Sequence, residues 1–424
     1  MISSIAFGLF GLAVLISVAV AFSHQKKSID WKQVAGGIGL QIVFAIIVIM
    51  VPGGREFFDA ISRVFVKIID FAMVGGQFIF GDLSNQADFG FIFAFQVLPT
   101  IIFFASLMSV LYHIGFMQKI VQGMAWVMQK VLRVSGSESL SVAANVFIGQ
   151  TEAPLVVRPY IAKMTESELF TMMVGGMATI AGAVLAAYIA MLGGADDAQR
   201  LFYARHLLAA SVMAAPATIV IAKLLRPETE ESLTKGTVHL EIEKTATNVI
   251  EAAANGAADG VKLSLNVAGM LLAFVALITM INFPLAWIGE ITGIETLTGE
   301  ALSMSLILGY LLSPLAWIIG IPWSEATIVG GLIGEKIVLN EFVAYMHLGQ
   351  IKDTLSEHSV LISTYALCGF ANFSSIAIQL GGIGGLAPNR RSDIARLGLR
   401  AVLGGTLATM MTATIAGVLT QLAA

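Results

Sequence analysis

Long runs of apolar residues, separated by short polar segments, dominate the pattern along this chain of 424 residues. A helix needs roughly 20 mostly apolar residues to cross the hydrocarbon core of a bilayer. Uncharged runs of about that length recur at 5–22, 34–52, 169–195, 266–284, 301–324, 359–388 and 401–424. The pattern predicts an all-α polytopic membrane protein, because the short alternating strands of a membrane barrel do not produce such runs.

Other segments carry charged and apolar faces at helical spacing, which is typical of helices that lie in the membrane interface. They are residues 54–72, 114–134 and 248–264. The acidic and polar segment 226–244 is the one convincing aqueous linker, and it divides the chain into two halves.

The two halves show the same order of elements, which predicts an internal inverted repeat. Each has an interrupted apolar segment (138–163 and 302–345, the second bent near 320–326), then a long segment broken at small residues (175–184 and 368–375), then a plain helix (201–224 and 398–422). Paired interrupted segments of this kind indicate a transporter whose binding site lies near the midplane of the bilayer.

These patterns divide the chain into five regions. They are N-terminal spans and an interfacial helix forming a scaffold (1–112), the first repeat (113–225), a polar linker (226–247), an interfacial helix and scaffold span (248–300) and the second repeat (301–424).

Composition and charge narrow the class further. The chain is 57% hydrophobic and 12% charged, with a mean hydropathy of +0.85, which excludes a soluble enzyme. The sequence has no cluster of basic residues with interleaved aromatic residues, so nothing in it indicates nucleic-acid binding. The single cysteine, Cys368, cannot form an intramolecular disulfide. Residues 5–22 have no preceding Lys or Arg and are predicted to be a first span rather than a signal peptide.

Basic residues follow the first span at 24–27 and separate the last two apolar runs at 389–400. By the positive-inside rule both loops face the cytoplasm. Both chain ends are then predicted to lie outside, with an even number of full spans between them.

The stretch "NVFIGQTEAPLVVRP" (145–159) places polar groups and prolines at membrane depth. Because non-helical backbone survives there only when protein or a water-filled cavity covers it, we interpret this stretch as the tip of a re-entrant hairpin. Pro154 stops the helix and leaves Gln150, Thr151 and Glu152 free to meet a polar solute. The alternative is a buried structural network, for example Glu152 with Arg158.

Glu341 is a second carboxylate at depth, and we expect it to be functional. Glu325 follows Pro322 at an apparent helix start, where a carboxylate favours the helix dipole, so we interpret it as structural. The neighbours Glu335 and Lys336 are expected either to neutralise one another or to sit at a helix end.

Asn372 and Ser375 lie three residues apart and therefore share a helical face. With Glu341 they form an acceptor-rich set suited to sugar hydroxyls, while the Gln150 amide suits a base edge. Phe370 either stacks on a planar ring or packs as an ordinary core residue.

Hard oxygen ligands at an unwound helix favour Na⁺. Asn145 offers a side-chain oxygen, Thr179 a hydroxyl, and the hairpin break its backbone carbonyls. The sequence has no cluster of carboxylates of the kind that binds Ca²⁺, which argues against a calcium site. The six histidines are scattered and do not have the H-E-x-x-H spacing of zinc proteases. The sequence also contains no G-x-S-x-G motif of serine hydrolases. Both observations argue against an intramembrane enzyme.

The motifs "GQTEAPL" (149–155), "NEFVAY" (340–345) and "CGFANFSSIA" (368–377) resemble the concentrative nucleoside transporters, bacterial branch, and the resemblance runs over about 3–424. It implies eight spans, two re-entrant hairpins, three interfacial helices, a homotrimer and a bacterial inner membrane. It also implies sodium-coupled symport of nucleosides (uridine and related) into the cell by an elevator-like movement, with no organic cofactor. Proton coupling through Glu152 or Glu341 is the alternative, and a passive channel is a further one.

The resemblance also implies roles for individual residues. Contacts to the nucleobase fall on Gln150, Thr151 and Glu152, contacts to the ribose on Glu341, Asn372 and Ser375, and apolar contacts on Val184, Leu263 and Phe370. Sodium would bind Asn145, Thr179 and the backbone oxygens of Ile148 and Ile180. Thr179 departs from the serine of the sodium-coupled bacterial members. The hydroxyl survives, so sodium is still expected, with an affinity that the added methyl changes.

Overall fold

The computed structural model describes residues 2–85, 89–236 and 246–423, and every regular element within these ranges is helical. Eight segments of the described chain are long and apolar enough to cross a bilayer. They are Ile2–Ala21, Trp31–Ile49, Pro52–Ser84, Phe93–His113, Glu166–Gly193, Asp197–Leu225, Val249–Thr292 and Pro388–Ala423. The prediction of an all-α multi-span protein is therefore confirmed.

The N-terminal region contains α1 (Ile2–Ala21), α2 (Trp31–Ile49), α3 (Pro52–Phe80) and α5 (Phe93–His113). Length and composition alone place α3 among the eight candidate spans, although it contains the predicted interfacial segment 54–72. One face of α3 is buried at Ser62, Val66 and Ile69 while its other residues are largely exposed. One buried and one exposed face are what the spacing of charged and apolar residues in segment 54–72 predicts.

The first repeat begins with α6 (Phe116–Leu132), which contains most of the predicted amphipathic segment 114–134, and a hairpin follows it. The remaining elements are α7 (Gly136–Asn145), a 3₁₀ turn (Ala153–Val157), α8 (Arg158–Ile161), α9 (Glu166–Ala178), α10 (Gly182–Gly193) and α11 (Asp197–Leu225). Two capping boxes explain where the buried helices start: Ser135 with Glu138 begins α7, and Thr165 with Glu168 begins α9. The break between α9 and α10 falls within the predicted range 175–184.

The second repeat contains α14 (Met304–Ile318), α15 (Trp323–Val338), α16 (Glu341–Ile351), α17 (Glu357–Leu367), α18 (Phe373–Leu386) and α19 (Arg391–Ala423). The bend predicted near 320–326 is confirmed, because the chain bends by 115° between α14 and α15. The hairpin itself turns later, at Leu339 and Asn340, between α15 and α16. Asn340 accepts a hydrogen bond from the amide of Val343 and thereby caps α16.

A single helix of 44 residues, α12 (Val249–Thr292), replaces the separate segments 248–264 and 266–284 expected from the pattern. The short α13 (Ile294–Thr298) follows it. Ser264 donates to the carbonyl of Leu98 at 3.1 Å, and an added Cβ on Gly260 would lie 2.7 Å from Cα of Ile102. Glycine therefore lets α12 approach α5 closely.

The predicted linker falls partly outside the described residues, which resume at 246 after a gap at 237–245. Its described beginning folds back on the first repeat. Thr234 shares a hydrogen bond with Ser137 at 2.9 Å, and Ser232 donates to Glu168. This part of the linker therefore covers the N-terminal ends of α7 and α9.

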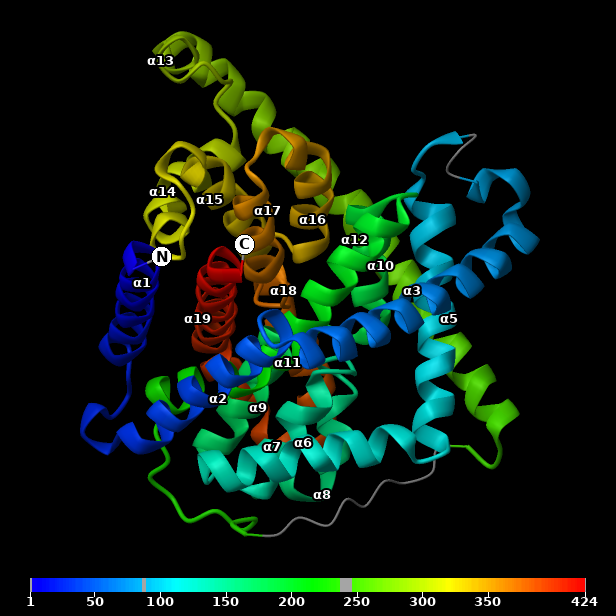
Figure 1. Ribbon diagram of the computed structural model, residues 1–424, viewed down its shortest axis with the longest axis vertical. Helices are drawn as coiled ribbons and strands as arrows, with labels where there is room; N and C mark the ends of the chain where they lie inside the picture. The colour runs from blue at the N-terminus through cyan, green and yellow to red at the C-terminus, as the bar shows by residue number, and fades with distance from the viewer. Residues whose placement is uncertain (1, 86–88, 237–245, 424) are drawn as a thin grey trace.

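The two hairpins lie on opposite sides of the molecule. Figure 1 shows α7 and α8 beside α6 at its lower edge, and α15, α16 and α17 in its upper half, with α9, α11, α18 and α19 between them. The candidate spans built from α9 with α10, from α11 and from α19 are each 89% buried over their most apolar window. The breaks in the paired helices are thereby enclosed in the centre of the fold.

Candidate functional site

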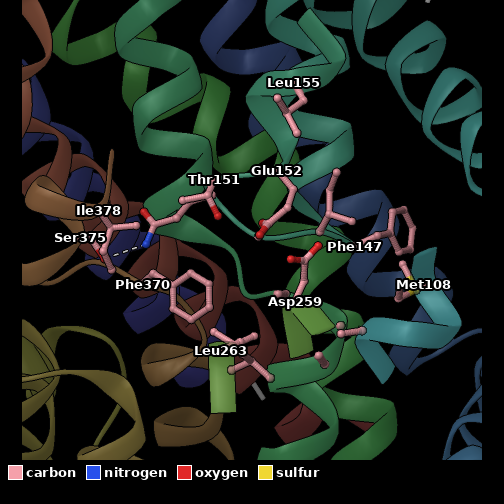
Figure 2. A pocket seen from close by; sticks show the side chains of 18 of the residues that line it. Met108, Phe147, Thr151, Glu152, Leu155, Asp259, Leu263, Phe370, Ser375 and Ile378 are labelled. Carbon is pink, nitrogen blue, oxygen red and sulfur yellow. Dashed lines mark hydrogen bonds between the residues drawn. The ribbon is translucent and has the colours of Figure 1, made fainter. Parts of the chain in front are cut away.

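A cavity of about 710 Å³ lies where the tip of the first hairpin meets both broken helices. Its walls also include residues of the second hairpin, of α5 and of α12. Figure 2 shows side chains of the first hairpin, of α5, of α12 and of the second broken helix around one space. A volume of this size suits a small polar organic ligand.

The nine residues predicted to contact substrate all line this cavity. They are Gln150, Thr151, Glu152, Val184, Leu263, Glu341, Phe370, Asn372 and Ser375. Residues up to 225 positions apart in the chain are thus brought together, as the hydrogen bond between Gln150 and Ser375 shows. Their individual roles stay predictions.

The Gln150 amide is held at both ends. Its Nε2 donates to Oγ of Ser375 at 3.0 Å (Figure 2), and its Oε1 accepts from Nε2 of Gln379 at 3.1 Å. Gln379 donates in turn to the carbonyl of Met173 at 2.9 Å. Sequence reasoning missed Gln379, although it lies one helical turn after Ser375 on the same face.

Glu341 is buried at the first position of α16, with 3% of its surface exposed. Its Oε1 accepts from the hydroxyl of Tyr188 at 3.0 Å, and its Oε2 accepts from Nδ2 of Asn372 at 2.9 Å. Asn372 also caps α18 by accepting from the amide of Ser375 at 2.8 Å. The carboxylate therefore joins the second hairpin to both broken helices. Tyr188 was missed because nothing distinguishes it locally from other aromatic residues in an apolar helix.

Glu152 and Asp259 present two carboxylates to the same part of the cavity. Figure 2 shows them pointing toward one another, Glu152 from the first hairpin and Asp259 from α12. Glu152 is exposed, which disfavours the alternative in which it belongs to a buried structural network. Asp259, 3.4 Å from Nζ of Lys262, is a cavity residue that sequence reasoning did not find.

The predicted sodium ligands lie where two helices end. Asn145 is the last residue of α7, and Thr179 follows the last residue of α9 in extended conformation. Nδ2 of Asn145 donates to the carbonyl of Ser141 at 3.0 Å. Its Oδ1 is buried without a partner among the described residues. A buried acceptor of this kind, next to two negative helix ends, fits a small cation.

Ile148 and Ile180 flank this point. Ile148 lines the cavity and Ile180 is fully buried. The carbonyl of Phe147, next to Ile148, accepts from the amide of Gly182 at 3.0 Å. The hairpin tip is therefore tied to the start of α10 beside the predicted ion ligands.

The predictions for the other charged residues have different outcomes. Glu325 accepts from the amide of Ser356 at 3.1 Å and lies in the first turn of α15, as the structural interpretation expects. Glu335 contacts His347 at 3.1 Å rather than Lys336. The expected neutralisation within the Glu335–Lys336 pair is therefore wrong, whereas their expected place at a helix end is confirmed.

A multi-span helical fold with two facing hairpins, two broken helices and an enclosed polar site between them defines a secondary membrane transporter. The chain also matches family models described as "Na+ dependent nucleoside transporter N-terminus" over residues 10–83, "Nucleoside recognition" over 94–195 and "Na+ dependent nucleoside transporter C-terminus" over 206–417.

Relatives match along nearly the whole chain. An uncharacterized transporter of Haemophilus influenzae is 46% identical over 99% of both chains. The nucleoside permease NupC of Helicobacter pylori is 43% identical over 98% of both. The sodium/nucleoside cotransporter 1 of Mus musculus is 40% identical over 96% of this chain and 63% of its own length.

A solved structure of CNTnw in an inward-facing substrate-bound state matches with a TM-score of 0.89 and 45% identity, covering 98% of this chain and 99% of that one. The chain therefore belongs to the concentrative, sodium-dependent nucleoside transporter family, and it is a multi-pass membrane transporter rather than an enzyme. The resemblance read from the three motifs is confirmed, and this family uses sodium as its coupling ion.

Proposed function

We propose that this protein carries uridine and related nucleosides into the cell by sodium-coupled symport. The observation that carries the proposal is the joining of Gln150, Glu341 and Asn372 in the wall of one cavity. An amide suited to a base edge and a carboxylate suited to vicinal hydroxyls then face one ligand. Nucleosides combine these two kinds of group in one small molecule.

In this arrangement the ribose lies against the second hairpin and α18. The oxygens of Glu341 accept from the ribose hydroxyls, while Asn372 and Ser375 complete the contact. The base lies near Gln150, Thr151 and Glu152. Val184, Leu263 and Phe370 cover the apolar faces of the ligand, each lining the cavity in the structure.

Sodium binds at the ends of α7 and α9, where Oδ1 of Asn145 has no protein partner in the described chain. The ion orders the hairpin tip that carries Gln150, so sodium and nucleoside strengthen one another's binding. Such a coupling is reciprocal by thermodynamic necessity. The rival is proton coupling, in which Glu152 or Glu341 carries the proton.

The membrane potential contributes to uphill transport when sodium moves with the nucleoside. One unit charge moved across 100 mV releases about 2.3 kcal/mol. Since about 1.4 kcal/mol corresponds to a tenfold ratio, this alone supports accumulation of roughly tens-fold. A passive channel does not use this energy.

We propose that transport follows an elevator movement, in which the repeats slide against a scaffold of the N-terminal spans, α3 and α12. Two ion pairs between α3 and α11 cross this boundary: Arg200 with Asp70 at 2.7 Å and Arg205 with Asp59 at 3.2 Å. Both are partly accessible to solvent, which suits contacts that break and re-form. A homotrimer in a bacterial inner membrane is the setting that the family resemblance favours.

The decisive test is uptake of radiolabelled uridine into proteoliposomes. One set receives an inward sodium gradient, a second an inward proton gradient, and a third both ions without a gradient. Accumulation with sodium alone supports the proposal. Accumulation with the proton gradient alone would show that sodium is not the coupling ion and that Glu152 or Glu341 is the candidate proton carrier. Equilibration without accumulation would indicate a channel.

A further inference from the structure

Lys336 is a fully buried lysine whose ammonium contacts neutral oxygens. Its Nζ donates to the carbonyl of Ala366 at 2.8 Å and to Oγ1 of Thr409 at 2.9 Å. Within the described chain no carboxylate oxygen lies at ion-pair distance from it. A buried ammonium held only by neutral groups is costly, so its position requires an explanation.

The location of Lys336 is informative because the fold repeats itself. Lys336 lies in the last turn of α15, the first arm of the second hairpin. Its two acceptors belong to the end of the first half of a broken helix, α17, and to the plain helix α19 that follows. The ammonium therefore sits where three particular elements of the second repeat meet.

The same three elements meet in the first repeat. Asn145 ends α7, the first arm of the first hairpin, and Thr179 follows the end of the broken helix α9. Ser211 of the plain helix α11 donates to the carbonyl of Val146, the residue after Asn145, at 2.8 Å. This corner lacks a lysine and instead contains the unpartnered Oδ1 of Asn145.

We infer that the Lys336 ammonium is a built-in cation that fills, in the second repeat, the position that the coupling sodium takes in the first. The inference rests on the proposed sodium-coupled function. Backbone carbonyls at a helix end and a threonine hydroxyl are ligands of the kind that sodium uses. Because the Lys336 ammonium already occupies these ligands in the second repeat, a second sodium ion is excluded from them. Each transport cycle then carries one sodium ion per nucleoside.

A simpler role for Lys336 would be to balance the charge of Glu341, to which it is electrostatically attracted. The contacts argue against this as its whole role. Both carboxylate oxygens of Glu341 are engaged by Tyr188 and Asn372, whereas the ammonium is turned toward Ala366 and Thr409. The two roles predict different sodium dependences and can therefore be separated.

The first experiment needs no substitution. The membrane potential at which sodium-driven uridine flux reverses is measured in proteoliposomes at several sodium gradients. We expect the value for one sodium ion per uridine, and a value corresponding to two would overturn the inference. Absence of any sodium-driven flux would instead contradict the proposed function, so the two failures are distinguishable.

The second experiment compares Lys336→Ala and Lys336→Gln with a matched control, Lys352→Ala. Lys352 also donates to a backbone carbonyl, that of Leu192 at 2.6 Å, away from the cavity. Uridine binding to purified protein is measured against sodium concentration, with monodisperse elution showing that each variant is folded.

For Lys336→Ala we expect weaker uridine binding at low sodium, recovery at high sodium or with methylammonium, and a Hill coefficient for sodium rising from about one toward two. The control and the native protein should both keep a coefficient near one. Unchanged sodium dependence and affinity in Lys336→Ala would overturn the inference. So would weakened uridine binding that neither sodium nor methylammonium restores, because that outcome assigns Lys336 to charge balance alone. If the lysine variants do not fold, the reversal potential of the native protein still decides.

Discussion

Nδ2 of Asn372 donates a hydrogen bond to Oε2 of Glu341 at 2.9 Å, linking the break of one helix to the tip of the second hairpin. In Glu341→Gln the side chain keeps its shape but loses its charge and one acceptor. A hydrogen bond to a charged group contributes about 1.5–3 kcal/mol, so we expect uridine binding to weaken about 10- to 100-fold. Calorimetric titration of purified protein with uridine measures this directly.

Deoxynucleosides supply the control for that substitution. If Glu341 holds the ribose, 2′-deoxyuridine should lose less affinity than uridine, because one partner hydroxyl is already missing. Glu325→Gln is a matched variant, since Glu325 contacts Ser356 and does not line the cavity. A Glu341→Gln protein that binds both ligands as the native protein does would remove Glu341 from the ribose site.

The orphaned Oδ1 of Asn145 leads to a prediction for sodium. In Asn145→Ala this oxygen is lost, and we expect the sodium concentration for half-maximal uridine binding to rise about tenfold, equivalent to about 1.4 kcal/mol. Ser141→Ala is the matched control, because it removes a buried hydroxyl from the same helix but leaves the carbonyl that Asn145 contacts. An unchanged sodium requirement in Asn145→Ala would place the ion elsewhere.

The elements that the sequence predicts well are those that depend on local hydropathy and helix signals. Gly320 and Pro322 mark the predicted bend, whereas the turn of the second hairpin at Leu339 and Asn340 carries neither glycine nor proline and was therefore not located from the pattern. The continuity of α12 was missed for a related reason. A change from an amphipathic to an apolar pattern does not by itself end a helix.

Contacts made only in three dimensions could not be found from local patterns. Tyr188 meets Glu341 across 153 positions of sequence. Asp259 reaches the cavity from the segment 248–264, in which the sequence analysis identified only Leu263 as a site residue. The pairing of Glu335 with Lys336 was inferred from adjacency. Neighbouring residues on a helix point in different directions, however, and each found another partner.

The proposed elevator movement can be tested at Arg200 and Asp70, whose ion pair joins α11 to α3. We replace both residues by cysteine in a Cys368→Ala background and link them with a bifunctional methanethiosulfonate reagent, which forms a reducible disulfide with each cysteine. If α11 slides against α3, the link should abolish uridine uptake but preserve uridine binding, and reduction of the reagent should restore uptake.

The two single-cysteine proteins treated with the same reagent control for modification alone. Cross-linked protein that transports at the native rate would show that α11 and α3 move together. In that case α3 would belong to the moving part together with α11, and the proposed boundary between them would be wrong.

The buried ion pair between Lys223 and Glu138 gives a prediction about stability. Both side chains are nearly inaccessible, with 4% and 2% exposed, and Lys223 also donates to Ser167 at 2.8 Å. Removing Glu138 leaves the buried Lys223 ammonium with only the partly exposed Glu228 as an ion-pair partner, at 3.6 Å. Breaking a buried ion pair costs up to about 3–5 kcal/mol. We therefore expect Glu138→Gln to unfold at a clearly lower temperature in detergent, as followed by fluorescence-detected gel filtration after heating.

The double variant Glu138→Gln with Lys223→Met should recover part of that loss, because it removes the buried ammonium together with its buried partner. Lys262→Met serves as the exposed counterpart: its pair with Asp259 has 76% and 74% of the side chains accessible and contributes about 0–1 kcal/mol. If Glu138→Gln is as stable as the Lys262 variant, the pair does not hold the first hairpin to α11. The stability of that corner would then have to come from the capping boxes at Ser135 and Thr165.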